Sequence, residues 1–296
     1  MRVAILGFGL IGGSVARALH ARAPGDWTVT AWSPSGDGPR QAQDAGEIDR
    51  AAGTIAQSVE AAEQIVLAAP PIECLDLLDQ LGGPLRRAVP EGAVVTDVAS
   101  TKRRLVERAA ERGIRFVGGH PMAGIERTGY DAAEPNLFEG RPWVVCTDGA
   151  DDVARARVEA LVTAVGARPI RMDAATHDAA VAAISHLPLV VSAGLVESVF
   201  GRDTGIAEPA RGVAYELAAS GWRDMTRLAR GDVAMGAGIA ATNPDELAAR
   251  LRGLREVLDR WLLELERDGG PAVDRLTTRL AAARVLAADD RAPSGS

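Results

Sequence analysis

Short apolar runs alternate with helical segments along the first half of the chain. The runs are bounded by glycine, proline or polar residues, as buried strands are, and the segments between them repeat their apolar residues with a helical period. This alternation predicts βαβ units and a parallel sheet. The expected strands are 2–6, 28–32, 64–68, 93–96 and 115–117, and the expected helices are 12–22, 72–87 and 102–111.

The pattern changes near residue 173. Before that point, strand-like runs at 142–146 and 168–172 flank a helical segment at 151–165, and we expect these strands to extend the sheet at its edge. After it, strand signals disappear and Ala, Leu and Arg dominate. We therefore expect one domain over 1–172, a helical domain over 173–288 and a disordered tail over 289–296, with helices at 175–200, 207–219, 222–230, 233–242, 245–267 and 271–288.

The first of these later helices, 175–200, is apolar on nearly all sides, which predicts deep burial or a place at a subunit interface. Pro188 has no N–H group to bond the carbonyl of Ile184, so the helix should bend there. Ser185 and His186 lie just before the expected bend.

Composition and charge narrow the classes of function. The 296 residues, 47% of them hydrophobic, suit two globular domains, and the net charge of -7 argues against binding to nucleic acid or an anionic membrane. Cys74 and Cys146 form no metal or redox spacing, so we interpret them as free thiols in a reducing compartment, which favours the cytoplasm. We expect no signal peptide, and we interpret the uncharged stretch 179–196 as a buried helix rather than a membrane span.

A glycine pattern lies between the first expected strand and the first expected helix. Gly7 permits the tight turn, Gly9 lets the backbone approach a pyrophosphate, and Gly12 allows close packing of helix on strand. The N–H groups at the start of the helix then face the phosphates. The pattern predicts a dinucleotide site, to which we assign Gly7, Gly9, Leu10, Ile11, Gly12 and Pro70.

The end of the second expected strand bears on the choice of cofactor. An NAD site usually carries an acidic residue there for the ribose 2′-hydroxyl, whereas this chain has Ser33. A small hydroxyl and a nearby cation, for which Arg40 is the candidate, would accept the 2′-phosphate of NADP. We therefore favour NADP over NAD. Asp37 would restore a preference for NAD if its loop folded back, and Ser33 has the alternative role of a turn residue.

Unusual residues gather at the ends of three further expected strands. In open α/β sheets, ligands bind outside the carboxyl ends of the strands, so these residues should share one edge. They are Ala69-Pro70-Pro71, Asp97 to Lys102, and Gly118-Gly119-His120.

His120 is the candidate general base at this edge, because a histidine can take a proton near neutral pH. Ser100 is the candidate to bond its ring and hold the useful tautomer. Asp97 is the alternative partner, although it is equally suited to cap the helix that begins near Thr101. For Lys102 we expect a solvated or structural role.

Taken together, these motifs resemble the prephenate and arogenate dehydrogenases of tyrosine biosynthesis. The matching segments occur in the order of that family and cover residues 1 to about 243. They are GFGLIGGS at 7–14, DVASTK at 97–102, GGHPMAG at 118–124, NLF at 136–138, HD at 177–178, SHLP at 185–188 and SGWRDMTR at 220–227.

The resemblance implies a Rossmann doubly wound sheet followed by an all-α dimerisation domain, and a homodimer. It implies oxidative decarboxylation of a cyclohexadienol acid without a metal: hydride leaves ring carbon 4 for the nicotinamide, His120 takes the proton of the 4-hydroxyl, and carbon dioxide departs. By the same resemblance, Ser100 supports His120, Arg227 binds a substrate carboxylate, and Ser185 and His186 line the substrate pocket.

Leu189 departs from the pattern of many members of the family, and alternatives to this function are open. Many prephenate-using members carry a second His after the SHLP segment, whereas this chain has Leu189; that change and Ser33 resemble the arogenate-using, NADP-dependent members. The alternatives are an enzyme for the 4-amino analogue of prephenate in a secondary pathway, and a non-catalytic NADPH-binding sensor. A sensor has no need for His120 and Arg227.

Overall fold

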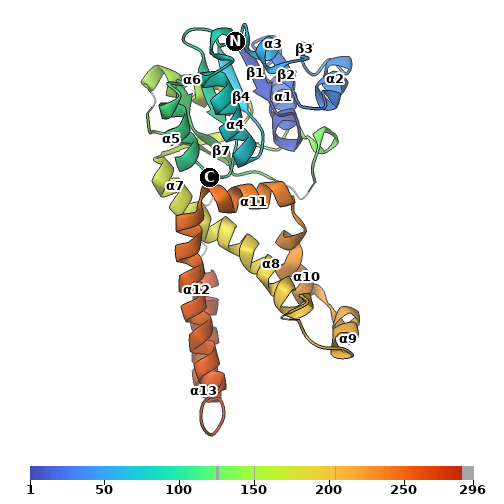
Figure 1. Cartoon of the computed structure of the whole chain (residues 1–296), viewed down its shortest axis with the longest axis vertical. Helices are drawn as coiled ribbons and strands as arrows, with labels where there is room; N and C mark the ends of the chain where they lie inside the picture. The colour runs from blue at the N-terminus through green and yellow to red at the C-terminus, as the bar shows by residue number, and fades with distance from the viewer. Residues whose placement is uncertain (125–126, 150, 204, 289–296) are drawn as a thin grey trace. The chain divides into compact units, whose positions relative to one another are not determined.

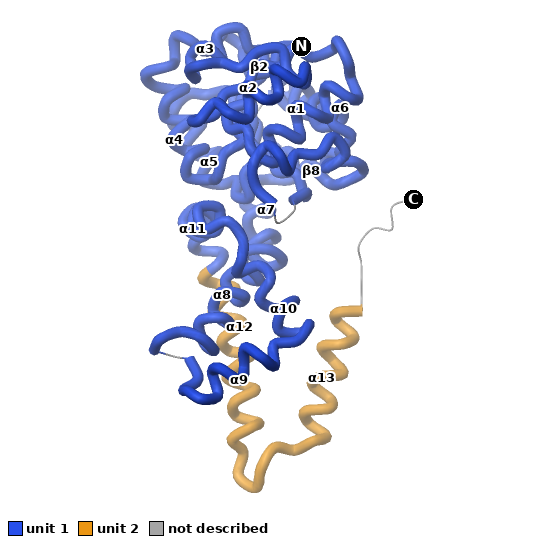
Figure 2. The backbone as a smooth tube through the Cα atoms, turned by 90° about the vertical axis from the view of Figure 1, so that its right-hand side faces the viewer, with its two compact units in different colours: residues 1–247 blue, residues 248–296 orange. Residues whose placement is uncertain are grey.

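A computed structural model describes residues 1–124, 127–149, 151–203 and 205–288. The expected tail at 289–296 lies outside these residues. Two compact units, Met1–Leu247 and Ala248–Ser296, divide the chain (Figure 2), and each is described by itself.

A six-stranded parallel sheet forms the centre of the first unit, in the order β3-β2-β1-β4-β5-β6. Figure 1 labels β1 to β4 of this sheet. The strand order reverses between β1 and β4, which is the switch point where doubly wound sheets bind ligands. The expected strands are confirmed to within one residue at either end. The strands are β1 (Arg2–Leu6), β2 (Thr28–Trp32), β3 (Arg50–Ala51), β4 (Gln64–Leu67), β5 (Val94–Asp97) and β6 (Phe116–Val117).

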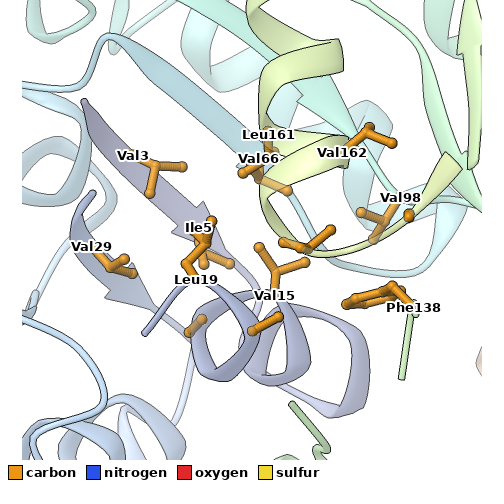
Figure 3. Close-up of a cluster of buried hydrophobic side chains, with 14 of the residues drawn as sticks. Val3, Ile5, Val15, Leu19, Val29, Val66, Val98, Phe138, Leu161 and Val162 are labelled. Atoms are coloured by element: carbon orange, nitrogen blue, oxygen red, sulfur yellow. The ribbon is translucent and has the colours of Figure 1, made fainter. Parts of the chain in front are cut away.

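Helices cover both faces of this sheet, which confirms the predicted fold class. One face packs α1 and α6 against Ile5 and Val66, as Figure 3 shows. The other face packs α3, α4 and α5 against Leu6 and Leu67. The helices of this half are α1 (Leu10–Arg22), α2 (Asp37–Asp44), α3 (Ile55–Val59), α4 (Pro71–Gly82), α5 (Arg103–Glu111) and α6 (Asp152–Ala164), with short 3₁₀ turns η1 (Arg86–Ala88) and η2 (Tyr130–Ala132).

Strands β8 (Pro142–Cys146) and β9 (Arg168–Met172) do not extend the large sheet, so that expectation is wrong. They form a second sheet with β7 (Gly119–Pro121), in the order β7-β8-β9, with β7 antiparallel to β8. The cause lies at Gly118 and Gly119. The chain leaves β6 after two residues, the Gly119 N–H turns to the carboxylate of Asp97, and the Gly118 carbonyl accepts a bond from Cys146. His120 therefore lies within a strand of the second sheet.

The long apolar helix is interrupted where Pro188 predicts it. Helix α7 (Ala174–Val181) passes into a π-helical segment, η3 (Ala182–His186), and then α8 (Leu187–Phe200). The wider turn before Pro188 absorbs the missing N–H group and the bulk of its ring. By length and composition Ala174–Phe200 would span a membrane, and 22% of its most apolar window is buried in the single chain. The deep burial expected for this helix is therefore not found among the described residues.

The later helices match the expected ranges to within about three residues. They are α9 (Ala210–Leu217), α10 (Ser220–Thr226), the 3₁₀ segment η4 (Arg227–Arg230), α11 (Val233–Thr242), α12 (Pro244–Leu265) and α13 (Val273–Ala288). In the second unit, Arg279 of α13 donates to the carbonyl of Val257 at 2.9 Å and lies over the ring of Trp261 of α12. The resulting helical hairpin leaves Leu262, Leu263, Leu280 and Leu286 exposed.

Candidate active site

A cavity of about 650 Å³ opens at the carboxyl ends of β1, β2 and β4. That volume is typical of a site for a cofactor. Gly7 has a φ of +96°, and a Cβ there would lie 2.3 Å from the carbonyl oxygen of Ala68. A Cβ at Gly12 would lie 2.3 Å from the Gly7 oxygen, whereas Gly9 faces open space. Gly9 also starts α1 without a side-chain cap, so the N–H groups of the helix are available to a phosphate.

The residues expected at the cofactor fall into two groups. Gly7, Gly9, Ser33 and Pro70 line the cavity. Leu10, Ile11 and Gly12 belong to the start of α1, where Gly12 packs on the strand. Arg40 does not line the cavity: its guanidinium donates to the carbonyl of Ser35 at 3.1 Å and to the carboxylate of Asp37 at 2.7 Å. Asp37 does line it, together with Glu73, Asp76 and Asp131.

Sequence reasoning missed Tyr130, which comes from the segment after β7 and lines the same cavity. Its ring stacks on Phe8 with centroids 5.3 Å apart, and its hydroxyl donates to Glu47. Arg17 of α1 lies over the same ring and pairs with Glu47 at 2.9 Å. Burial opposes the ionised form of Glu47, but its bonds to Arg17 and Tyr130 prevail and lower its pKa. No local motif marks Tyr130, because its partners are distant in sequence.

A buried ion pair lies beneath the two glycines that precede His120. Asp97, at the end of β5, pairs with Lys102, and both side chains are fully buried. Asp97 also accepts bonds from the N–H groups of Gly119 and Ala99, each at 2.9 Å. Burial raises the pKa of Asp97, while Lys102 and the two N–H groups oppose that rise. Asp97 therefore neither caps α5 nor bonds the ring of His120, and Lys102 is structural rather than solvated.

The Asp97–Lys102 pair lies so close to Gly118 and Gly119 that a side chain at either position would be crowded. A Cβ at Gly119 would lie 2.5 Å from the carbonyl oxygen of Asp97, and one at Gly118 would lie 3.2 Å from Cδ of Lys102. Real Cβ atoms do not approach a backbone atom to 2.5 Å, so a side chain at Gly119 would push β7 away from β5. The Gly-Gly-His sequence thus sets the position of His120.

His120 ends a chain of hydrogen bonds that leads into α7. Its Nδ1 lies 2.8 Å from Nε2 of His177, and Nδ1 of His177 lies 2.8 Å from Oδ1 of Asp178. The side chains of His177 and Asp178 are each 1% exposed. Asp178 in turn accepts bonds from the backbone N–H groups of Lys102 at 2.8 Å and Arg103 at 2.9 Å, and so caps α5.

The surroundings of His120 favour its neutral form. Burial lowers the pKa of His120 well below 6.5, and the positive charge of Lys102 lowers it further by repelling the charged form of the ring. Burial would raise the pKa of Asp178, but the bonds from His177 and from the backbone of Arg103 and Lys102 prevail and lower it. A neutral imidazole that lies close to a carboxylate is suited to accept a proton.

The substrate residues suggested by the sequence occupy different surroundings. His186 is buried, with Nδ1 3.4 Å from Asn243 Nδ2, and burial lowers its pKa. Ser185 is exposed at the π-helical segment, and Arg227 is exposed on η4, which packs against α8. Ser100 is partly buried at the sheet edge; His177, not Ser100, meets Nδ1 of His120. The structure thus places His120 beside His177. The sequence analysis included His177 in the HD segment but assigned it no role.

Contacts within the first unit join the sheet to the helices that follow it. The Thr101 and Thr242 hydroxyls lie 2.7 Å apart in a buried hydrogen bond. Asn243 donates to the carbonyl of Asp178 at 2.9 Å, also buried. Both contacts lie beside the carboxylate that caps α5, so they hold α7 and α11 at the edge that carries His120.

Two family profiles together match most of the chain. Residues 15–171 match "Prephenate dehydrogenase, nucleotide-binding domain", and residues 173–278 match "Prephenate dehydrogenase, dimerization domain". The chain is 31% identical over 270 residues to a protein of Bacillus subtilis (strain 168) named prephenate dehydrogenase, covering 90% of this chain and 68% of that one.

Two solved structures resemble the whole chain. Synechocystis arogenate dehydrogenase has a TM-score of 0.77 at 31% identity, covering 97% of this chain and 99% of its own. Prephenate dehydrogenase from A. aeolicus, in complex with hydroxyphenyl propionate and NAD⁺, has a TM-score of 0.87 at 25% identity, covering 98% of each chain.

Lys102→Met should destabilise the protein by about 3–5 kcal/mol, because it leaves the carboxylate of Asp97 buried without its counter-charge. Urea unfolding followed by circular dichroism measures the change. Arg50→Met is the matched control, since the Arg50–Glu60 pair is exposed and worth at most about 1 kcal/mol. A Lys102→Met protein as stable as the control would contradict the structural role of the pair.

Proposed function

Since the chain belongs to the prephenate dehydrogenase family, we propose that it catalyses the NAD(P)-dependent oxidative decarboxylation of arogenate or prephenate in tyrosine biosynthesis. The observation that carries this proposal is His120. It is kept neutral by its surroundings and lies beyond the carboxyl ends of β5 and β6, further along the same sheet edge as the cofactor cavity. A nucleotide-binding sensor has no use for a base in that position.

The proposed reaction moves a hydride, a proton and carbon dioxide. The hydrogen on ring carbon 4 leaves with its electron pair, for which the bound nicotinamide supplies the acceptor. His120 takes the proton of the 4-hydroxyl as the C–O bond gains double-bond character. The bond to the ring carboxylate then breaks, its electron pair enters the ring, and carbon dioxide departs. The phenolate oxygen recovers the proton from His120, so the base is regenerated and aromatisation drives the sequence.

For the substrate, we propose that Arg227 binds a carboxylate, that Ser185 and His186 line the pocket, and that Ser100 supports His120. These roles are supported by the motif match and by the positions of Ser100 at the sheet edge and His186 beside Asp178. An Arg guanidinium suits a carboxylate because its planar fork can form two parallel bonds. Leu189, where many relatives that use prephenate have a second His, favours an arogenate-type substrate.

We propose NADP as the preferred cofactor. The end of β2 offers the hydroxyls of Ser33 and Ser35 instead of a carboxylate, and both residues line the cavity. The guanidinium of Arg40 lies beside them on the carbonyl of Ser35, and it balances the charge of Asp37. The other lining carboxylates come from α4 and from η2, not from the end of β2.

We further propose a cytoplasmic homodimer formed through the helical half, with a domain boundary at residue 172/173. The match of 173–278 to a dimerization domain supports this assembly. So do the apolar side chains left exposed, among them Ile184 at 75% in η3 and Leu286 at 78% in α13. A second copy of this chain would remove these surfaces from water.

The direct test is to mix the protein with NADP and arogenate, prephenate or the 4-amino analogue, and to follow reduced cofactor and carbon dioxide. His120→Asn should lower kcat at least about 100-fold with little change in KM, as loss of a general base does. For the wild type, kcat/KM should stay level through neutral pH and fall only in acid, because the lowered pKa keeps His120 neutral until then. Wild-type turnover by His120→Asn would refute the base assignment.

Arg227→Ala should raise the substrate KM about 10- to 100-fold and leave the cofactor KM unchanged, because a hydrogen bond to a charged group contributes about 1.5–3 kcal/mol. Steady-state kinetics with each substrate in turn gives both constants. Arg230→Ala, on the same exposed 3₁₀ segment, is the control and should behave as wild type. Equal KM values for the two variants would remove Arg227 from the substrate site.

Ser33→Asp should lower the ratio of kcat/KM for NADP over NAD by about 10-fold or more, because a carboxylate at the end of β2 repels a 2′-phosphate. Ser33→Ala is the control, since it removes only the hydroxyl that accepts the Gly36 N–H at 3.2 Å. A wild-type enzyme that already prefers NAD would contradict the proposed cofactor.

A further inference from the structure

The hydrogen-bond chain behind His120 has a direction that follows from its far end. An ionised carboxylate only accepts hydrogen bonds, so Asp178, which accepts from the Lys102 and Arg103 N–H groups, must also accept from Nδ1 of His177. A neutral His177 that donates through Nδ1 carries a lone pair on Nε2. The contact at 2.8 Å from that Nε2 then requires Nδ1 of His120 to be the donor.

We propose that His177 and Asp178 are positioning residues that hold His120 as its Nδ1–H tautomer and so keep the lone pair of Nε2 free to take the substrate proton. The inference rests on the proposed function, since it assigns a role in the same proton transfer. It assigns the contact at Nδ1 of His120 to a pair from the helical half, rather than to Ser100 or Asp97, and leaves the support proposed for Ser100 to other parts of the site.

His177 and Asp178 are rigidly held, as residues that position another side chain must be. The carboxylate of Asp178 is fixed by the first turn of α5, and its backbone carbonyl by Asn243 at 2.9 Å. His177 and Asp178 are 1% exposed, so water does not compete for these bonds. The ring of His177 meets that of His120 edge to face, at 5.1 Å between centroids. Second partners of this kind generally fix the tautomer of a functional histidine.

The same hydrogen-bond chain stabilises the positive charge that forms on His120 during the proposed reaction. When Nε2 of His120 accepts the substrate proton, the new imidazolium keeps its Nδ1–H bond to His177, whose own Nδ1–H bond ends on the carboxylate of Asp178. Among the described residues, the other charged and titratable groups that act on this cluster include Asp97, Lys102, Cys146 and His186. Lys102 repels an imidazolium but is paired with Asp97, and Asp178 is the carboxylate that the hydrogen-bond chain connects to the new charge.

Asp178→Asn changes a carboxylate whose Oδ1 accepts from both Nδ1 of His177 and the Lys102 N–H, and whose Oδ2 accepts from the Arg103 N–H. With its nitrogen toward His177, the asparagine amide keeps the bond from Arg103, loses the bond from Lys102 and reverses the chain. His120 then carries its proton on Nε2, and the base is blocked. We expect kcat to fall about 100- to 10,000-fold, as when the analogous acid of a Ser-His-Asp triad becomes an amide, with KM values within about threefold.

Nitrogen-15 NMR of histidine-labelled protein gives a readout that needs no turnover. The four histidines allow assignment by substitution. His120 should be protonated on Nδ1 in the wild type and on Nε2 in Asp178→Asn. A wild type with His120 protonated on Nε2 overturns the inference whether or not the proposed substrate is right. A wild type with the expected tautomer that oxidises none of the three substrates supports the inference and refutes the proposed function.

Two further variants guard against a simple loss of structure. Asp173→Ala removes the cap of the same helix, where Asp173 accepts the Thr176 N–H at 2.7 Å, and should leave kcat unchanged. His177→Phe keeps an aromatic ring of similar size but offers no acceptor, and should lower kcat at least about 10-fold. Folded His177→Phe and Asp178→Asn proteins with wild-type kcat and an unchanged pH profile would overturn the inference.

Discussion

The carboxylate of Asp178 is the contact on which the arrangement of the candidate site depends. It caps α5 through two backbone N–H groups and holds His177, while its own backbone carbonyl is bound by Asn243. Asp178 of α7 therefore joins three parts of the site. These are the start of α5, the ring of His177 that contacts His120, and Asn243, which follows α11. An unpaired buried carboxylate is costly, so each of these donors is constrained to its place. The position of His120 follows from this constraint.

A second buried acid sets the other side of the same site. The carboxylate of Asp97, paired with Lys102, binds the N–H of Gly119 beside β5. The large sheet therefore ends at β6, and the smaller sheet begins with β7. A buried ion pair stabilises a fold little compared with apolar packing, so its value here is positional. The candidate cofactor cavity is lined by the glycine turn after β1 and also by Tyr130, so a segment far along the chain contributes to it.

Much of this was predictable from the sequence, because hydrophobic periodicity fixes which segments are strands and helices. The bend at Pro188 followed from one missing N–H group, and the shared edge of Pro70, Ser100 and His120 followed from parallel strand order. Periodicity says nothing of long-range polar contacts, so the roles of His177, Tyr130 and Lys102 escaped it. Polar α2 and the two-residue β3 lack the apolar repeat that marks an element. The second sheet depends on a bond between Gly119 and a side chain 22 residues earlier.

A crystal structure of the protein with NADP and the phenolic product of the proposed reaction would show directly which atom of His120 faces the substrate. We expect the phenolic oxygen within hydrogen-bond distance of Nε2 of His120, with Nδ1 still on His177 and the ring carbon opposite that oxygen free of a carboxylate. A phenolic oxygen bound elsewhere, or a His120 that has turned Nδ1 toward the ligand and left His177, would contradict this expectation.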